Sequence, residues 1–348
     1  MDMSNDIWAL AEIENGKLKS ISLQLASKAA ELASAIGGQS VAIALGKGAG
    51  ATTAALGATG VQSLITSDDS VYDDYLAQPS VDVLAELIRS RQPKAVLVPM
   101  TNAGRDIAGR LAARLNLGVE YNVTSVEISG DQIAMMVPAF GGQLNVSSTF
   151  AGDGTRLILA RQNAFQVAKT GGTANAEMVT APSAPANGAK VSGPFDTEHA
   201  NDEGHMGTED GHPTYFPPVS RSNVEEAAII VSGGRGVGGP EGFAAIDALA
   251  KALGGVVGAS RPVTDDGWLP HRHHIGQTGR TVKPDVYIAC GISGAVQHQA
   301  GMQTSKSIIA INKDKDAPVF TFCDIGVVGD LKVIIPELTK LVEARKHH

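Results

Sequence analysis

The segment from His271 to Asp314 reads HRHHIGQTGRTVKPDVYIACGISGAVQHQAGMQTSKSIIAINKD, and it is the most informative part of the sequence for the fold. Two apolar runs within it, Val286 to Cys290 and Ser307 to Ile311, are typical of strands buried on both faces of a parallel sheet. Between them lie a Gly-Ile-Ser-Gly turn at 291–294 and a predicted helix start near Ala295. The segment therefore predicts one complete strand–helix–strand unit.

The same alternation extends outward to both ends of the chain. Upstream we expect strands at 7–13, 40–45, 61–66, 95–99, 227–231 and 256–258, strand-like runs centred on Met135, Val146 and Ile158, and helices at 23–36, 75–91, 107–115 (N-cap Thr101 or Asn102) and 241–253. Downstream we expect a short last strand at 319–323 and a closing helix at 331–344. Strands that alternate with helices favour parallel sheets covered on both faces. The predicted fold is α/β, with two doubly wound domains and mainly parallel sheets.

A change in composition divides these domains. Residues 181–219 begin rich in Pro, Ala, Gly and Ser and continue as an acidic stretch with several histidines. Histidine and carboxylate can bind transition metals, but the spacing is irregular and no predicted helix holds the side chains together. Low hydrophobicity with net negative charge favours a solvated linker. We expect an N-terminal scaffold and subunit-contact domain at 1–180, an acidic His-rich linker or loop at 181–222, and a second α/β domain at 223–348.

Composition also excludes several classes of protein. The formal net charge of −8 argues against nucleic acid as the main partner, and no apolar run approaches a membrane span. The N-terminus, MDMSNDIWALAEI, is acidic and enters a strand-like run directly, so we expect no signal peptide. The two cysteines, Cys290 and Cys323, each lie in an apolar run and are expected to be reduced thiols. We therefore expect a cytoplasmic protein.

Anion-binding turns are concentrated in the second domain. Ser232 to Gly238 follows a predicted strand, and its glycines allow backbone N–H groups to approach a diphosphate, with Arg235 adding a fixed charge. Ser293-Gly294, at a helix start, is a second such turn. In the first domain, Gly46 to Gly50 matches neither dinucleotide nor P-loop fingerprints. Two turns with arginines in one domain favour a dinucleotide there and a scaffold role for the first domain.

Side-chain donors lie close to these turns. Gln277-Thr278-Gly279 and Gln297-His298 supply amide, hydroxyl and imidazole groups that would suit the heteroatoms of a ring such as flavin. Each alone is also typical of an ordinary turn or helix start. No motif pairs a nucleophile with a base, which argues against hydrolase chemistry.

Together these motifs resemble the alpha subunit of electron transfer flavoproteins. The resemblance rests on SGGRG (232–236), GASR (258–261), IGQTG (275–279), YIACGISGAVQHQAGM (287–302), IIAINKD (308–314) and GVVGDL (326–331), and in the first domain on SLQLASKAAELA, LVPMTNAGRDIAGRLAARL and VPAFGGQL. The 181–219 segment has no matching motif. The resemblance implies a heterodimer with a beta subunit, FAD bound mainly in a Rossmann-like second domain, and electron transfer without substrate turnover.

The resemblance also implies a set of FAD-binding residues. These are Arg235, Ser260, Arg261, Ile275, Gly276, Gln277, Thr278, Ser293, Gly294, Ala295, Val296, Gln297, His298, Asn312, Asp330 and Leu331. Arg235 and Ser260 would bind the diphosphate, and Arg261 would lie beside the isoalloxazine and stabilise a reduced, anionic flavin. Thr278 would bond near N5, Gln277 at the adjacent carbonyl, and His298 at the pyrimidine carbonyl. Ser293 to His298 would surround the ribityl chain and phosphate, and Asn312, Asp330 and Leu331 the adenosine end.

Two kinds of electron carrier remain open at this point. A simple carrier would pass electrons from an acyl-CoA dehydrogenase to a quinone-linked oxidoreductase, whereas an electron-bifurcating member would oxidise NADH and divide electrons between ferredoxin and an enoyl-CoA-type acceptor. The run His271-Arg272-His273-His274 is more basic than in simple members and, with Trp268-Leu269-Pro270, leans toward the second. It would be either a wet loop at the domain rim or a cluster that tunes the flavin. A stand-alone nicotinamide dehydrogenase is disfavoured because its fingerprint is missing, and a pure interaction module would be colourless.

Overall fold

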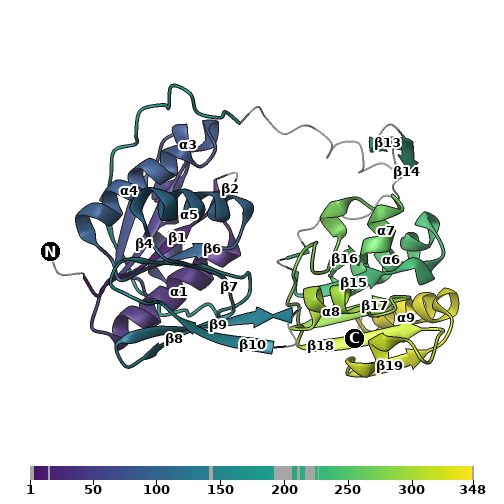
Figure 1. Cartoon of the computed structure of the whole chain (residues 1–348). Coiled ribbons are helices and arrows are strands. Elements are labelled where there is room, and N and C mark those ends of the chain that lie inside the picture. Colours follow the sequence, from purple (N-terminus) through teal and green to yellow (C-terminus); the bar gives the residue numbers. More distant parts are fainter. Residues whose placement is uncertain are drawn as a thin grey trace. The chain divides into compact units, whose positions relative to one another are not determined.

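A computed structural model describes residues 4–14, 16–140, 144–191, 206–209, 212–215, 224–225 and 227–346. The chain divides into two compact units, Met1–Gly193 and Pro194–His348 (Figure 1). Among the described residues, no helix is long and apolar enough to cross a membrane. The predicted domain limits at 181 and 222 stay predictions.

The first unit is built on a seven-stranded parallel sheet of order β12-β5-β4-β1-β6-β11-β7. Its strands are β1 (Ile7–Ala11), β4 (Ser40–Leu45), β5 (Ser63–Ser67), β6 (Ala95–Pro99), β7 (Val119–Val123), β11 (Arg156–Ala160) and β12 (Asn175–Met178). Its helices are α1 (Ser20–Ala35), α2 (Thr53–Gly57), α3 (Val71–Asp74), α4 (Gln78–Arg91) and α5 (Asn102–Leu115), and the short pair β2 (Ile13–Glu14) and β3 (Lys17–Leu18) follows β1.

The central strand β1 shows why this sheet is covered on both faces. All five of its residues are buried. Ile7 and Ala9 belong to the core cluster on the α1 face, whereas Trp8 and Leu10 belong to the cluster formed with α4 and α5. Alternate side chains therefore fill opposite cores. The continuous apolar run is the expected pattern of such a strand.

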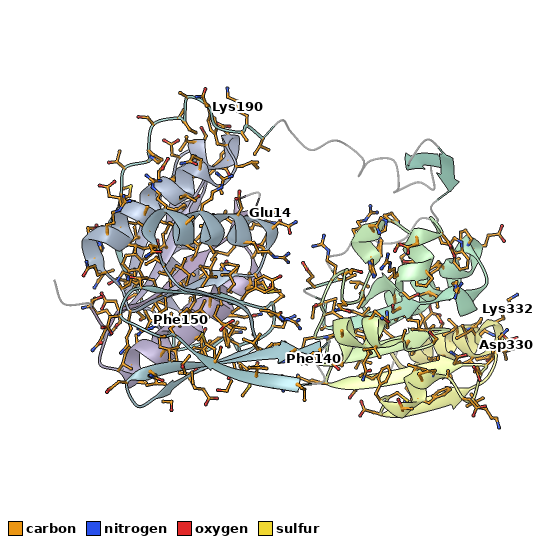
Figure 2. The ribbon with its side chains drawn as sticks, viewed as in Figure 1. Glu14, Phe140, Phe150, Lys190, Asp330 and Lys332 are labelled. Carbon is orange, nitrogen blue, oxygen red and sulfur yellow. The ribbon has the colours of Figure 1, made fainter. Side chains whose placement is uncertain are left out.

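An antiparallel sheet of order β10-β9-β8 was not predicted. It contains β8 (Ser125–Ser129), β9 (Gln132–Ala139) and β10 (Leu144–Thr149). Phe140, at the end of the β9–β10 hairpin (Figure 2), is 77% exposed. Its φ of 50° is uncommon for a residue with a side chain.

The second unit contains a five-stranded parallel sheet of order β16-β15-β17-β18-β19. Its strands are β15 (Ile229–Gly233), β16 (Val256–Ala259), β17 (Val286–Cys290), β18 (Ser307–Asn312) and β19 (Ile325–Val328), and its helices are α6 (Phe243–Leu253), α7 (Arg261–Asp265), α8 (Val296–Met302) and α9 (Leu331–Lys346). This is the 2-1-3-4-5 order of a doubly wound fold. The α/β fold with mainly parallel sheets is confirmed.

Some predicted elements were wrong in detail. The run Val319–Cys323 is not the last strand: Pro318–Thr321 forms a 3₁₀ turn, η7, and β19 follows it. Pro318 starts the turn, and the Val319 N–H donates to the Ser293 carbonyl instead of to a neighbouring strand. The helix expected from Tyr75 begins at Gln78, and α3 precedes it as a separate turn.

The predicted linker is only partly within the described residues. Its first part lies along α3, where Leu76 N–H donates to the Ala189 carbonyl and Val191 N–H to the Asp74 carbonyl. A two-stranded antiparallel pair, β13 (Met206–Glu209) and β14 (His212–Tyr215), is also described. The remainder, including His199 and His205, lies outside the described residues. Within those that are described, no group of His, Cys, Asp or Glu could hold a metal ion.

Candidate functional site

A cavity of about 520 Å³ lies at the carboxyl ends of β15 and β17. The strand order reverses between these strands, and ligands of open α/β sheets bind at this position. The cavity is lined by Gly234, Arg235, Gly236, Ser260, Arg261, Pro262, His274, Ile275, Gly276, Gln277, Thr278, Gly291, Ile292, Ser293, Ala295, Gln297, His298, Asn312, Asp314, Ala317 and Pro318.

Two glycine turns form one wall by direct backbone contact. Gly236 N–H donates to the Gly291 carbonyl over 3.0 Å. A Cβ at Gly236 would lie 2.7 Å from the Gly291 Cα, so no side chain fits at this crossing. The N–H groups of Gly234 and Gly236 are thus used within the protein, and the exposed Arg235 between them is the group that this wall offers to a diphosphate.

The α7 start forms the next part of the wall. Ser260 is buried, and its N–H donates to the Gly233 carbonyl over 3.0 Å, which ties it to the end of β15. Arg261 is exposed and donates from Nε to Asp265 Oδ2 over 3.1 Å. Exposed pairs of this kind contribute about 0–1 kcal/mol. Asp265 therefore orients the Arg261 side chain but holds it only weakly. A negatively charged ligand can compete with Asp265 for the Arg261 cation.

The loop 275–280 is fastened to α8. Gln277 N–H donates to the Gln297 carbonyl over 2.7 Å, and Val282 N–H donates to the Gly301 carbonyl over 2.8 Å. Gly301 lies so close to Gly276 that a Cβ on Gly301 would be 2.4 Å from the Gly276 nitrogen. The side chains of Gln277 and Thr278 are exposed at the cavity. Their position is therefore set by α8.

His298 is the buried imidazole of the cavity. It is 7% exposed, and its Nε2 lies 2.9 Å from the hydroxyl of the fully buried Tyr287. Burial lowers the pKa of His298 to about 4, although the backbone carbonyl of Ile275 acts in the opposite direction. Burial also raises the pKa of Tyr287 above its usual range. Both groups are therefore neutral at pH 7.

The run His271–His274 is divided between surface and core. His271 is exposed, whereas His273 is fully buried and its Nδ1 lies 2.9 Å from the Val257 carbonyl. Burial lowers the pKa of His273 to about 4. His274 lines the cavity, and its pKa is lowered first by burial and then by His271. The wet-loop hypothesis is wrong for His273 and His274, because both pack against β16 or the cavity.

Most residues predicted for the site line this cavity, but Gly294, Val296, Asp330 and Leu331 do not. Gly294 has a φ of 85° and packs on Val319, and Val296 is exposed at the start of α8. Asp330 accepts from the Lys332 N–H at the start of α9 (Figure 2). A Cβ on Gly291 would contact Leu331. The roles proposed for Asp330 and Leu331 stay predictions.

Several lining residues were not predicted. Apart from the turns and the His271–His274 run already singled out, they are Pro262, Asp314, Ala317 and Pro318. Asp314 could have been found, because it follows the end of β18 at the same sheet edge. Ala317 and Pro318 enter only through the 3₁₀ turn that replaced the expected strand, and no sequence signal indicated them.

The glycine loop of the first unit is already occupied by the chain's own carboxylates. Lys47 N–H donates to Asp73 over 2.9 Å, and Gly48 N–H donates to Asp68 over 3.0 Å. Gly50 N–H also donates to Asp68. The donors that would bind a phosphate are therefore used internally, and the scaffold role of this domain stays a prediction.

Comparison with known proteins places both units. A family model described as the electron transfer flavoprotein domain matches residues 7–186, and one described as the electron transfer flavoprotein FAD-binding domain matches residues 223–303. The electron transfer flavoprotein subunit alpha of Mycobacterium tuberculosis is 39% identical over 98% of this chain and 99% of the relative. That of Thermoanaerobacterium thermosaccharolyticum is 35% identical over 99% and 100%, and that of Clostridium acetobutylicum 33% over 97% of each.

The donor set around the cavity fits the cofactor that the second family model names. The arginines beside the close-packed glycine turns suit its diphosphate, and the amide, hydroxyl and imidazole groups suit its ring. FAD is therefore the cofactor. By these matches across nearly its whole length, the chain belongs to the electron transfer flavoprotein alpha-subunit family and acts in electron transfer.

Proposed function

We propose that this chain pairs with a beta subunit and carries electrons from an acyl-CoA dehydrogenase-type flavoenzyme to a quinone-linked oxidoreductase. The observation that carries the proposal is the cavity at the β15–β17 switch point, which combines close-packed glycine turns, two arginines and a buried imidazole. No nucleophile–base pair lines it among the described residues, which fits redox carriage rather than substrate chemistry. A cytoplasmic location is part of the same proposal.

Each part of the wall has a proposed role. Arg235 and Ser260 would hold the diphosphate, and Ser293 to His298 would surround the ribityl chain and phosphate. Gln277, Thr278 and His298 would orient the ring, with Arg261 stabilising negative charge on it. Bound FAD supplies the redox chemistry, while these residues set its orientation and its electrostatic environment. Asn312, whose amide donates to the Ile292 carbonyl over 3.0 Å, would lie toward the adenosine end together with Asp330 and Leu331.

A second candidate is an electron-bifurcating complex that uses NADH and ferredoxin. The position of His274 supports it: this buried histidine lines the cavity directly before the 275–279 loop. A histidine so close to the ring would make the flavin potential sensitive to local charge.

One measurement separates the two candidates. The chain would be purified with its beta subunit, and flavins per heterodimer would be counted from the visible spectrum and the protein concentration. One FAD supports the simple carrier and two support the bifurcating complex. A colourless heterodimer that gains no flavin on incubation with FAD would contradict the proposal. A second assay would follow flavin reduction by a purified acyl-CoA dehydrogenase with its substrate, and separately by NADH.

A further inference from the structure

Arg161, directly after β11 in the first unit, is a cation that no carboxylate of the described residues neutralises. Its side chain is half-buried, and its Nε donates to the Oδ1 of Asn122, near the end of β7. Its backbone N–H donates to the Val123 carbonyl over 3.0 Å, so main chain and side chain are both fixed to β7. Burial lowers the pKa of Arg161, but a guanidinium stays charged at pH 7. A cation held in this way without a counter-charge is destabilising.

The carboxylates of the neighbouring elements are bound by other groups. Glu120, on β7, accepts from the Ser148 hydroxyl over 2.7 Å. Asp106, on α5, accepts from Arg110 Nε over 2.7 Å. Within the part of the chain that the structure describes, Arg161 thus has a fixed position and a hydrogen-bond acceptor but no negative charge beside it. A counter-charge would have to come from another molecule.

Arg105 brings a second cation to the same edge of the sheet. It is exposed near the start of α5, and its Cζ lies 5.8 Å from the ring centroid of Tyr121, the residue before Asn122. Tyr121 also acts electrostatically on Arg161, so it lies near both cations. Tyr121 is 46% exposed, and Val119 on the same strand is 40% exposed. Arginines beside an exposed tyrosine are typical of protein–protein interfaces.

The donors at this edge fit the carboxylate of a protein better than a free phosphate. Phosphates bind at helix N-termini, but the N-terminus of α5 is already capped by Thr101, whose hydroxyl also bonds to Glu12. Arg161 uses Nε for Asn122, and its two terminal nitrogens have no partner among the described residues. The planar fork of these two nitrogens matches the two oxygens of a carboxylate.

We propose that Arg161, with Arg105 beside it, binds an aspartate or glutamate side chain of the beta subunit in a charge pair across the subunit interface. Asn122 holds the guanidinium in position before the partner binds, which reduces the side-chain entropy lost on association. Tyr121 and Val119 would shield the pair from water, and shielding strengthens the attraction between the charges. The inference rests on the proposed function, which includes the beta subunit.

The first test measures the affinity of the full-length chain for the beta subunit. Arg156→Gln is the matched control for Arg161→Gln, because Arg156 is a half-buried arginine at the opposite end of the same strand and donates to the Gly152 carbonyl. Loss of one partner of a buried charge pair should weaken the heterodimer at least about thirtyfold in Arg161→Gln. The exposed Arg105 should matter less, so Arg105→Gln should lose up to about fivefold. Arg156→Gln should bind like the wild type.

Urea unfolding of the chain without its partner separates binding from a structural role. Arg161→Gln removes a cation that has no counter-charge in the described chain, so it should unfold at no lower urea concentration than the wild type. A residue that only held the fold together would show the reverse, with a lower unfolding midpoint and an unchanged affinity once folded.

The second test identifies the group that binds the cations. A carbodiimide joins an amine to a carboxylate in contact with it. In the heterodimer, Arg161→Lys should therefore become linked at position 161 to an aspartate or glutamate of the beta subunit, as read from the linked peptides by mass spectrometry. Arg156→Lys should give no link at position 156.

Wild-type affinity in Arg161→Gln, or no link to the beta subunit in Arg161→Lys, would overturn the proposal. A free anion at the site would also overturn it. In that case, sodium phosphate or sodium acetate would raise the unfolding midpoint of the wild-type chain but not that of Arg161→Gln. A wild-type chain that forms no heterodimer would contradict the proposed function instead, so the two failures are distinguishable.

Discussion

Gly301→Ala is the sharpest test of how the loop 275–280 is held. The new Cβ would lie 2.4 Å from the Gly276 nitrogen and 2.5 Å from its Cα. Ordinary carbon contacts are about 3.5 Å or longer, so α8 and the loop must separate by roughly 1 Å. Overpacking of this kind costs about 1–3 kcal/mol, and the helical gain of alanine over glycine offsets roughly 1 kcal/mol of it.

The separation should weaken FAD binding more than it weakens the fold. The hydrogen bonds from Gln277 N–H and Val282 N–H cross the same contact. If each loses about 1 kcal/mol, FAD affinity falls on the order of tenfold to thirtyfold. FAD titration of the deflavinated heterodimer, followed by flavin fluorescence, measures this. Gly109→Ala on α5 is the matched control, because nothing lies within 4 Å of its Cβ. If Gly301→Ala binds FAD as tightly as the control, the contact does not position the loop.

Three further predictions concern charge, pH and capping. Arg261→Ala should lower the flavin potential, while Asp265→Asn, which releases the Arg261 cation, should raise it. Both potentials would be measured by spectroelectrochemical titration. Potentials that shift in the same direction in the two variants would refute the pairing argument. Since folding lowers the pKa of His273 to about 4 from 6.5, the unfolded chain binds the proton more tightly, so the unfolding free energy should fall as pH drops from about 6.5 to 4. Urea unfolding measured between pH 6.5 and 4 should show a smaller decrease in unfolding free energy for His273→Leu than for the wild type. Thr101→Ala removes the N-cap of α5 and the hydroxyl bonded to the half-buried Glu12. It should therefore lower the unfolding free energy, measured by chemical denaturation, by about 1–2 kcal/mol, and Thr101→Ser should restore most of this loss.

The buried strands could be predicted because each is a continuous apolar run in the sequence and is buried in the structure. Ser40–Leu45, Ala95–Pro99 and Val286–Cys290 have the expected limits. Asn175–Met178 could not be found, because all four residues are exposed and only pairing with β5 makes them a strand. The prediction for Val319–Cys323 was wrong for the opposite reason: an apolar run can also form part of a 3₁₀ turn, here one in which only Val319 is buried.

The site, like the fold, could be predicted from local motifs but not where it depends on contacts between residues distant in the sequence. The motifs indicated which loops meet at the sheet edge, since the carboxyl ends of parallel strands converge. They did not indicate that Arg261 would pair with Asp265, although the i,i+4 spacing permits it on α7. The motifs also could not indicate which histidines of His271–His274 are buried and which are exposed. Burial of His273 depends on the Val257 carbonyl, which lies 16 residues earlier.

The glycine loop at Gly46–Gly50 also bears on how such domains diverge. Asp68 and Asp73 occupy the backbone donors from within the chain, so the loop holds a permanent internal anion. The loop therefore needs no bound ligand to satisfy these donors. A change at one or two carboxylates would leave the same donors unsatisfied and open to a phosphate from solution. At this loop, a scaffold domain and a nucleotide-binding domain would differ in the source of the negative charge. In the first it is a carboxylate of the chain itself, and in the second it is a bound phosphate.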